Sequence, residues 1–338
     1  MSHSDPADVT IIEVSGAATD PEGRARFEEW VEVFHRVQRA DTGSSDAWSA
    51  EELRTVLDNP IKFFVDLAAV TADGQVVGAA ELIFQREDNT HLVILNIGVL
   101  PAFRRRGIGR RLIEEVERVT REHGRRTIIT ETIWSGDEGA ADVSGEFARR
   151  LGFEDVQTSR RSDLDVTTVA IDPDIPTGYA IETHVGTPPQ ADADDRAWLL
   201  RRMSTDAPLG GLDMEEQQWD AARIRSADER MERMGRGRVS AFARHLESGR
   251  LVAFTEIQVP AASPDLAYQQ DTLVLREHRG HGLGLALKAA NIAVLRDAYP
   301  GVERVRTWNA LENSHMLAVN DALGCTTSGF EREWQKQL

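Results

Sequence analysis

Two short segments of the sequence carry the same combination of glycine and cationic side chains. Residues 104–109 and 279–284 both read R-x-x-G-x-G, and each follows an apolar run and opens an amphipathic stretch. Glycines let a turn come close to a ligand, and a helix that begins there points unpaired N–H groups at it. The pattern therefore predicts two anion sites suited to phosphate. The side-chain donors beside them are Arg104, Arg105, Arg106, Arg279 and His281.

The two turns belong to a longer internal repeat. Their offset is 279 − 104 = 175, and the same offset relates Glu81 to Glu256. A chain of 338 residues is long enough for two domains that each bury a core. A proline-rich stretch between the copies indicates the boundary. We therefore expect an N-terminal domain at 1–165, a linker at 166–190 and a C-terminal domain at 191–338.

Hydrophobic periodicity predicts the same order of elements in both copies. In the first copy we expect strands at 9–14, 62–70, 75–84, 91–99 and 127–134, and helices at 25–38, from 48, at 108–123 and at 140–150. In the second copy we expect helices from 198 and 219 and at 283–298 and 314–323, with strands at 238–245, 251–259, 267–275 and 302–308. The expected class is mixed α/β, with two domains that each hold a mixed, mostly antiparallel sheet flanked by helices.

Composition narrows the class of partner. Lys and Arg total 39 against 56 Asp and Glu, a net charge of −17, which disfavours nucleic-acid and membrane partners. The single cysteine, Cys325, rules out an intramolecular disulfide and a cysteine-based metal cluster, and it fits a reducing cytoplasm. The scattered histidines lack metal-ligand spacing, so we expect no metal. The polar residues 1–8 do not look like a secretory signal, so we expect a cytoplasmic protein.

The glycine turns and their flanking segments resemble the GNAT superfamily of acyl-CoA-dependent N-acyltransferases, in its tandem actinobacterial form. The resemblance covers 96–112, 271–287 and the closing Leu-Gly segment of each half. It implies acetyl-CoA as cosubstrate, with its pyrophosphate on the turn and its pantetheine arm along the preceding strand. The implied contacts are Val99, Leu100, Arg104, Arg105, Arg106, Gly107, Ile108 and Gly109, and in the second copy Val274, Leu275, Arg279, Gly280, His281, Gly282, Leu283 and Gly284.

The two copies differ at two further positions of the GNAT pattern. GNAT domains often carry an asparagine ten residues before the terminal Leu-Gly and a tyrosine three residues before it. In the second copy these positions hold Asn313, an implied cofactor contact, and Asn320. In the first copy they hold Ala141 and Ala148. The second half keeps more of the pattern, so we expect it to be catalytic, without a tyrosine as general acid.

Acyl transfer to an amine requires a base and donors for the developing oxyanion. Glu256, central in its strand, and Asp271, three residues before Val274, are the candidate bases, and for each the alternative is a structural carboxylate. The backbone N–H groups of Val274 or Leu275 are the candidate donors. With Asp206 and Asp213, the two candidate bases could face the second cleft, so we expect a cationic amine as acceptor.

The predicted function is acetyl transfer from acetyl-CoA to a primary amine of a small molecule, by direct attack in a ternary complex. The protein would act as a monomer or homodimer. Three alternatives remain open. They are an antibiotic-modifying enzyme for aminoglycoside-like amines, a mycothiol-synthase-like enzyme, and a non-catalytic acyl-CoA-binding module. Residues 307–310 and 315–316 do not resemble mycothiol synthase.

Overall fold

The computed structural model describes residues 9–169, 174–261 and 265–338. The polar amino-terminal residues 1–8 and residues 170–173 of the expected linker lie outside the described residues. The chain divides into two compact units. Unit 1 holds 1–157, 211–213 and 331–338, and unit 2 holds 158–210 and 214–330. Within the described ranges, no helix has both the length and the apolar character needed to cross a membrane.

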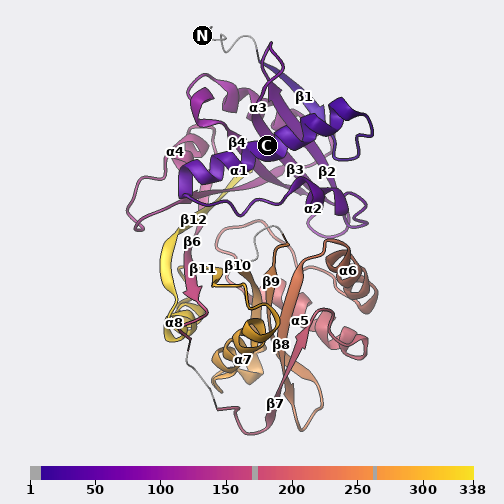
Figure 1. Cartoon of the computed structure of the whole chain (residues 1–338), viewed down its shortest axis with the longest axis vertical. Coiled ribbons are helices and arrows are strands. Elements are labelled where there is room, and N and C mark those ends of the chain that lie inside the picture. The colour runs from indigo at the N-terminus through magenta and orange to yellow at the C-terminus, as the bar shows by residue number, and fades with distance from the viewer. Residues whose placement is uncertain (1–8, 170–173, 262–264) are drawn as a thin grey trace. The chain divides into compact units, whose positions relative to one another are not determined.

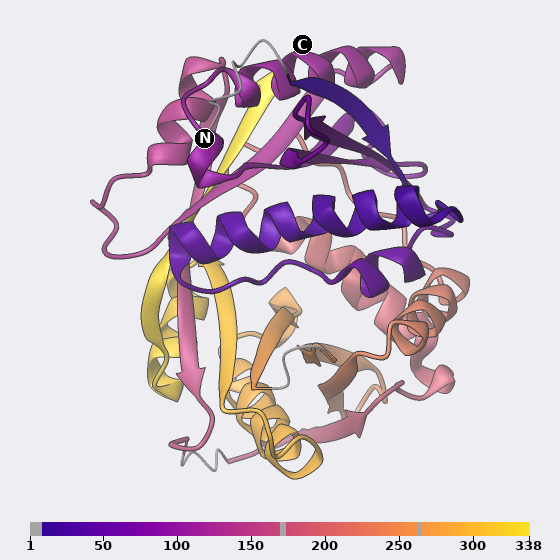
Figure 2. The same ribbon diagram turned by 45° about the horizontal axis from the view of Figure 1, so that its top comes forward.

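Unit 1 contains the first glycine turn. Its strands follow the order β1-β2-β3-β4-β5, with the end of β12 beside β5, and the β4–β5 pair is parallel. In Figure 2 the long helix α1 lies on one face of this sheet and α3 on the other. The elements are β1 (Thr10–Val14), α1 (Pro21–Thr42), α2 (Ala50–Thr55), β2 (Lys62–Val70), β3 (Val76–Gln85), β4 (Leu92–Val99), η2 (Pro101–Phe103), α3 (Ile108–Glu122), β5 (Thr127–Trp134) and α4 (Val143–Arg150).

Unit 2 contains the second glycine turn and repeats the arrangement. Its strands follow the order β6-β11-β10-β9-β8-β7, and the β10–β11 pair is parallel. The elements are β6 (Glu154–Asp165), β7 (Tyr179–Val185), η3 (Gln190–Asp192), α5 (Ala193–Asp206), α6 (Ala221–Arg233), β8 (Gly237–His245), β9 (Leu251–Val259), β10 (Leu266–Val274), η4 (Arg276–His278), α7 (Leu283–Ala298), β11 (Arg304–Ala310), α8 (Ser314–Leu323) and β12 (Thr326–Gln337). The mixed α/β class predicted from the sequence is confirmed.

The last strand of each repeat contributes residues to both units. In unit 2, β6 pairs antiparallel with β11, with Asp165 opposite Arg304, and Figure 1 shows these strands beside β12. In unit 1, the Trp334 side chain of β12 is fully buried, and its Nε1 donates to Thr132 Oγ1 at 2.9 Å. The compact units therefore differ from the sequence repeats in the segments they contain. The boundaries 1–165 and 191–338 remain a prediction about the repeats.

Local capping sets where the helices that flank the first site begin. Helix α1 begins at Pro21, earlier than expected, because the Asp20 side chain accepts from the Gly23 backbone N–H and proline suits the first helical position. The predicted apolar face of α1 is buried, with Phe27 and Trp30 each 1% exposed. Helix α4 begins later than expected, at Val143, because Asp142 is its N-cap.

Candidate active site

Both R-x-x-G-x-G turns form the same backbone structure. Gly107 and Gly282 are the N-caps of α3 and α7, with φ of 82° and 76°, and neither helix start has a side-chain cap. The first-turn N–H groups of both helices therefore point out of the turn without a capping acceptor. A second left-handed residue precedes each of them, Gly280 in unit 2 (φ 81°) and Arg105 in unit 1 (φ 63°). Two such positions with an uncapped helix start form an anion nest.

The first arginine of each motif builds the turn. Arg279 donates from Nε to the Val274 carbonyl at 3.0 Å, and Arg104 makes the same bond to Val99 at 2.9 Å. Both terminal nitrogens of Arg104 also pair with Asp41 on α1, at 2.8 Å each. Because these guanidinium groups are already engaged, their predicted phosphate contacts remain a prediction.

The strand that leads into each turn separates from its parallel neighbour. The β4–β5 register runs from the Leu92–Thr127 pair only to Leu95–Thr130, and Thr130 Oγ1 donates to the Leu95 carbonyl at 2.8 Å. In unit 2 the β10–β11 register covers Leu266 to Tyr268, while β10 continues to Val274. The end of β10 therefore pairs with β9 alone, and its other edge is open.

Backbone direction distinguishes the two candidate oxyanion donors. The Leu275 N–H donates to the Val252 carbonyl of β9 at 3.0 Å, so this group is already engaged and Leu275 is the wrong one of the two candidate donors. Successive N–H groups of a strand point to opposite edges, so the Val274 N–H faces the open edge. The sequence could not show which of the two N–H groups is unpaired, because the alternation of paired and unpaired N–H groups along β10 depends on its register with β9.

A β-bulge places the candidate bases together. The β9–β10 register gains one residue between Gln269 and Thr272, so Asp271 lies in the bulge. The Gln269 amide fixes this bulge by donating to the Glu256 carbonyl at 2.7 Å. The Asp271 side chain reaches solvent, yet desolvation by the surrounding protein and the charge of Glu256 raise its pKa to about 6. Asp271 can therefore accept a proton near neutral pH.

Glu256 also belongs to a buried ion network. Its Oε2 lies 3.8 Å from Nη1 of Arg238, and Arg238 pairs with Asp228 at 3.0 Å. Asp228 in turn accepts both terminal nitrogens of Arg196, at 2.8 and 2.9 Å. Glu256 therefore has a structural ion pair, as the alternative to a role as base predicts. Asp271 is the less constrained of the two carboxylates.

Of the other two carboxylates expected at the second cleft, Asp206 is buried against the arginines of the second turn and Asp213 lies in unit 1. The Asp206 side chain is 1% exposed and pairs with Arg276 at 3.6 Å and Arg279 at 3.4 Å. Asp213 belongs to unit 1, where its carboxylate lies 3.3 Å from Nε2 of His91. The electrostatic attraction of unit 2 for a cation therefore rests on Asp271 and Glu256.

Asn320, at the position where the GNAT pattern has tyrosine, joins a buried polar chain. Its Oδ1 accepts from Lys288 Nζ at 2.7 Å, and its Nδ2 donates to Asn309 Oδ1 at 2.6 Å. Lys288 and Asn320 are 3% and 1% exposed, and burial lowers the pKa of Lys288 to about 8. Nothing in the sequence marks Lys288 as buried, because a lysine in an amphipathic helix normally faces solvent. Asn313 caps α8, accepting from the Met316 N–H at 3.2 Å.

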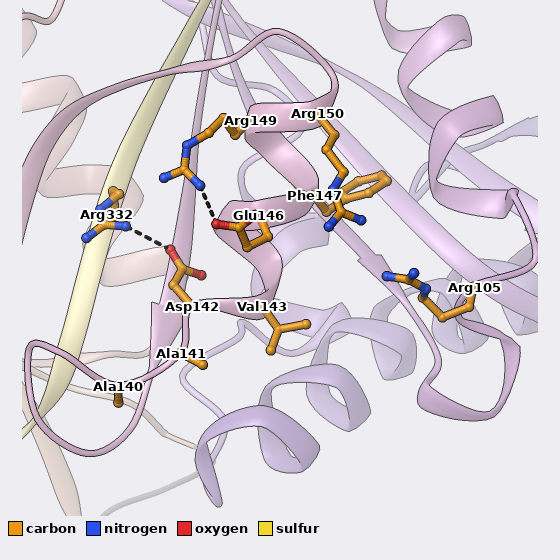
Figure 3. A pocket seen from close by; sticks show the side chains of 10 residues that line it. All are labelled: Arg105, Ala140, Ala141, Asp142, Val143, Glu146, Phe147, Arg149, Arg150 and Arg332. Atoms are coloured by element: carbon orange, nitrogen blue, oxygen red, sulfur yellow. Dashed lines mark hydrogen bonds and ion pairs between the residues drawn. The ribbon is translucent and has the colours of Figure 1, made fainter.

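Arginines line a pocket beside the first turn. This pocket has a volume of about 460 Å³, and Figure 3 shows Arg105 on one side and the residues of α4 on the other. Arg149 pairs with Glu146, and Arg332 lies 3.5 Å from Asp142. The lining residues are Arg105, Ala140, Ala141, Asp142, Val143, Glu146, Phe147, Arg149, Arg150 and Arg332. The excess of guanidinium groups suits a second anionic group of a ligand held on the first turn.

Three histidines gather around Tyr179 next to the second turn. His278 Nδ1 lies 2.9 Å from the Tyr179 hydroxyl, and the His245 and His281 rings are 5.4 and 5.7 Å from the tyrosine ring. Burial, with the nearby His245, lowers the pKa of His278. Among the described residues no group of three or more His, Cys, Asp or Glu could hold a metal ion.

Comparison with known proteins agrees with this geometry. The model of the acetyltransferase (GNAT) family matches residues 25–153. The matched segment is most of the first repeat and contains the first glycine turn. The chain is 24% identical to a mycothiol acetyltransferase of Geodermatophilus obscurus, over 80% of this chain and 82% of that one. It is 27% identical to a mycothiol acetyltransferase of Salinispora tropica, over 76% and 77%.

Two solved structures share the fold of this acetyltransferase. A tandem GNAT protein from the clavulanic acid biosynthesis pathway superposes with a TM-score of 0.80 at 24% identity, covering 97% of this chain and 98% of that one. A GCN5-related N-acetyltransferase from Sphaerobacter thermophilus gives 0.69 at 17% identity, over 99% and 97%. The recognition of a tandem GNAT protein from its repeated turns is thus confirmed.

Proposed function

We propose that this acetyltransferase moves the acetyl group of acetyl-CoA to a primary amine of a small cationic molecule, and that the reaction takes place in unit 2. The observation that carries the proposal is the position of Asp271. It lies in a bulge beside Glu256, three residues before the open edge at Val274 and just ahead of the second anion nest. The amine, the base and the donor for the oxyanion would meet along one short stretch of β10.

Acetyl-CoA suits the residues that are present. The nest at Gly280 and Gly282 has open space where a Cβ would stand, and the backbone there is left-handed at both positions. A pyrophosphate would accept from the uncapped N–H groups of α7, and the pantetheine arm would follow the open edge of β10. GNAT enzymes as a rule use acetyl-CoA, which agrees with this chemistry.

The chain's own groups would then divide the work of direct attack. The amine nitrogen attacks the thioester carbonyl, the Val274 N–H donates to the developing oxyanion, and the Asp271 carboxylate accepts a proton from the amine. The thiolate leaves as the carbon–sulfur bond breaks. The carboxylates of Asp271 and Glu256 attract an ammonium, but they also raise the pKa of the ammonium and so oppose its deprotonation. The pKa of Asp271, raised to about 6, makes this carboxylate a stronger base than an ordinary aspartate and so favours the proton transfer.

Paired variants of the two turns test this assignment. Gly282→Asp places a side chain and a negative charge in the second nest, while Gly107→Asp does the same in the first. We expect Gly282→Asp to abolish acetyl transfer and to remove one acetyl-CoA binding event measured by calorimetry, with turnover retained in Gly107→Asp. Loss of turnover only in Gly107→Asp would assign the chemistry to unit 1.

The similarity to mycothiol acetyltransferases, across more than three quarters of the chain, favours a second candidate. Here the acceptor would be the deacetylated form of mycothiol. An acceptor panel containing that compound, aminoglycosides, polyamines and amino acids, assayed by thiol release, separates the two. Release with no member of the panel, despite acetyl-CoA binding, would support the non-catalytic acyl-CoA-binding alternative.

A further inference from the structure

Unit 1 contains a second, smaller pocket that the proposed reaction does not use. It lies between α1, α2 and the sheet, and it encloses about 10 Å³, the room that one water-sized group needs. No residue of a glycine turn lines it. The lining residues are Phe27, Trp30, Leu53, Val56, Leu57, Phe64, Asp66 and Glu81.

Two buried carboxyl groups face each other in this pocket. Asp66 of β2 is the register partner of Glu81 of β3, and the two residues are 6% and 8% exposed. Glu81 Oε2 accepts from Asn96 Nδ2 at 2.7 Å. Asp66 Oδ1 is buried without any hydrogen-bond partner, a state that normally costs about 1–3 kcal/mol. The pocket thus holds an acceptor that lacks its donor.

The surroundings of the pair offer little positive charge. Burial and the charges of Glu81 and Glu13 raise the pKa of Asp66 to about 8, so this carboxyl carries a proton at neutral pH. Burial also raises the pKa of Glu81, against the opposing effects of the Asn96 hydrogen bond and the Lys62 charge. The walls contributed by α1 and α2 are aromatic and aliphatic, and Arg54, above the Phe27 ring, pairs with Glu28 at 2.9 Å.

The equivalent position in unit 2 shows what unit 1 lacks. Glu256 corresponds to Glu81 in the repeat, and its register partner is Ser240 instead of a second carboxyl. Two residues before Ser240 stands Arg238, whose guanidinium lies 3.8 Å from Glu256. Two residues before Asp66 stands Phe64. Unit 1 therefore has a carboxyl where unit 2 has Ser240, and a phenyl ring where unit 2 has the internal cation.

We propose that this pocket of unit 1 binds the ammonium group of an aliphatic primary amine. An –NH3⁺ group is about the size of a water molecule, and its N–H bonds would satisfy Asp66 Oδ1 and the facing Glu81. The rings of Phe27, Trp30 and Phe64 line the pocket, and aromatic rings attract cations. The hydrocarbon part of the amine would leave past Leu53 and Leu57, which are half-buried.

Calorimetry on the full chain tests the site, with butylammonium as the probe and butanol as its neutral counterpart. We expect saturable binding of butylammonium to the chain and release of about one proton at pH 7, seen as a dependence of the heat on buffer ionisation enthalpy. Asp66→Asn, which keeps the shape of the side chain, should weaken this binding at least about tenfold and abolish the proton release. Phe64→Arg, which copies Arg238, should also abolish it.

The matched variant in the other unit is Glu256→Gln. Glu256→Gln should impair acetyl transfer but leave the proton-releasing binding of butylammonium intact. Asp66→Asn should do the opposite, leaving acetyl transfer intact. A failure of the proposed reaction and a failure of this site therefore give different results. Thermal unfolding of each variant verifies the fold. Equal binding of butanol, or binding that Asp66→Asn leaves unchanged, would overturn the proposal.

Discussion

Arg279 reaches back to the strand that precedes it, with Nε donating to the Val274 carbonyl at 3.0 Å. The same bond recurs between Arg104 and Val99 at 2.9 Å. This contact holds the glycine turn against the end of the strand, so the anion nest and the open strand edge keep a fixed geometry. The conserved geometry of the two copies explains why arginine, with its Nε–H and planar fork, stands at this position.

Replacing this arginine by lysine tests its structural role. Arg279→Lys keeps the charge but loses the Nε donor, so we expect the free energy of unfolding to fall by about 0.5–1 kcal/mol and acetyl-CoA binding to weaken. Chemical denaturation and calorimetry measure the two effects. Arg104→Lys is the matched variant of unit 1. Unchanged stability and unchanged affinity in both variants would show that the bond is incidental.

The pH profile of turnover reports on the carboxylate pair of unit 2. Turnover should rise as the pH passes about 6, the pKa of Asp271, because only the ionised carboxylate accepts a proton. Asp271→Asn should remove this limb and lower kcat about 100-fold. Glu256→Gln removes a charge that raises the Asp271 pKa, so the limb should move to lower pH. Identical profiles for all three proteins would refute the assignment of Asp271 as the base.

Arg105 stores backbone strain in the first turn. It has a φ of 63°, where unit 2 has Gly280. Arg105→Gly should raise the free energy of unfolding by about 1 kcal/mol and weaken the binding of an anion in the arginine-lined pocket. The reverse change, Gly280→Arg, should destabilise the protein by a similar amount. Denaturation curves showing no gain for Arg105→Gly would mean that the surrounding contacts relieve the strain.

Lys288 should make stability depend on alkaline pH. Burial lowers its pKa from 10.5 to about 8, so between these values the unfolded chain binds more protons than the folded one. The free energy of unfolding should therefore rise from pH 8 to pH 10.5. Lys288→Met should abolish that rise, because the variant has no titrating group at this position. Lys336→Met is the control, since Lys336 pairs with Glu117 at 2.5 Å, and an equal slope in the two variants would contradict the prediction.

The sequence by itself determined the repeat, the mixed α/β class and the two glycine turns, because these depend on local rules. A helix that starts at Gly107 or Gly282 needs only the left-handed freedom of glycine and an apolar 3.6-residue period. Even the asymmetry at Asn313 and Asn320 was visible without coordinates. The sequence did not show what these two side chains do: Asn313 caps a helix, and Asn320 accepts a hydrogen bond from Lys288.

Tertiary structure alone decided which groups meet. Strand register put Asp66 against Glu81, the bulge in β10 put Asp271 near Glu256, and the ladder with β9 consumed the Leu275 N–H. Register and bulges depend on contacts between residues distant in the chain, and a shift of one residue reverses the face of every side chain. The ends of β6 and β12 pair with partners remote in sequence for the same reason, so local periodicity could neither delimit the units nor distinguish paired carboxylates from unpaired ones.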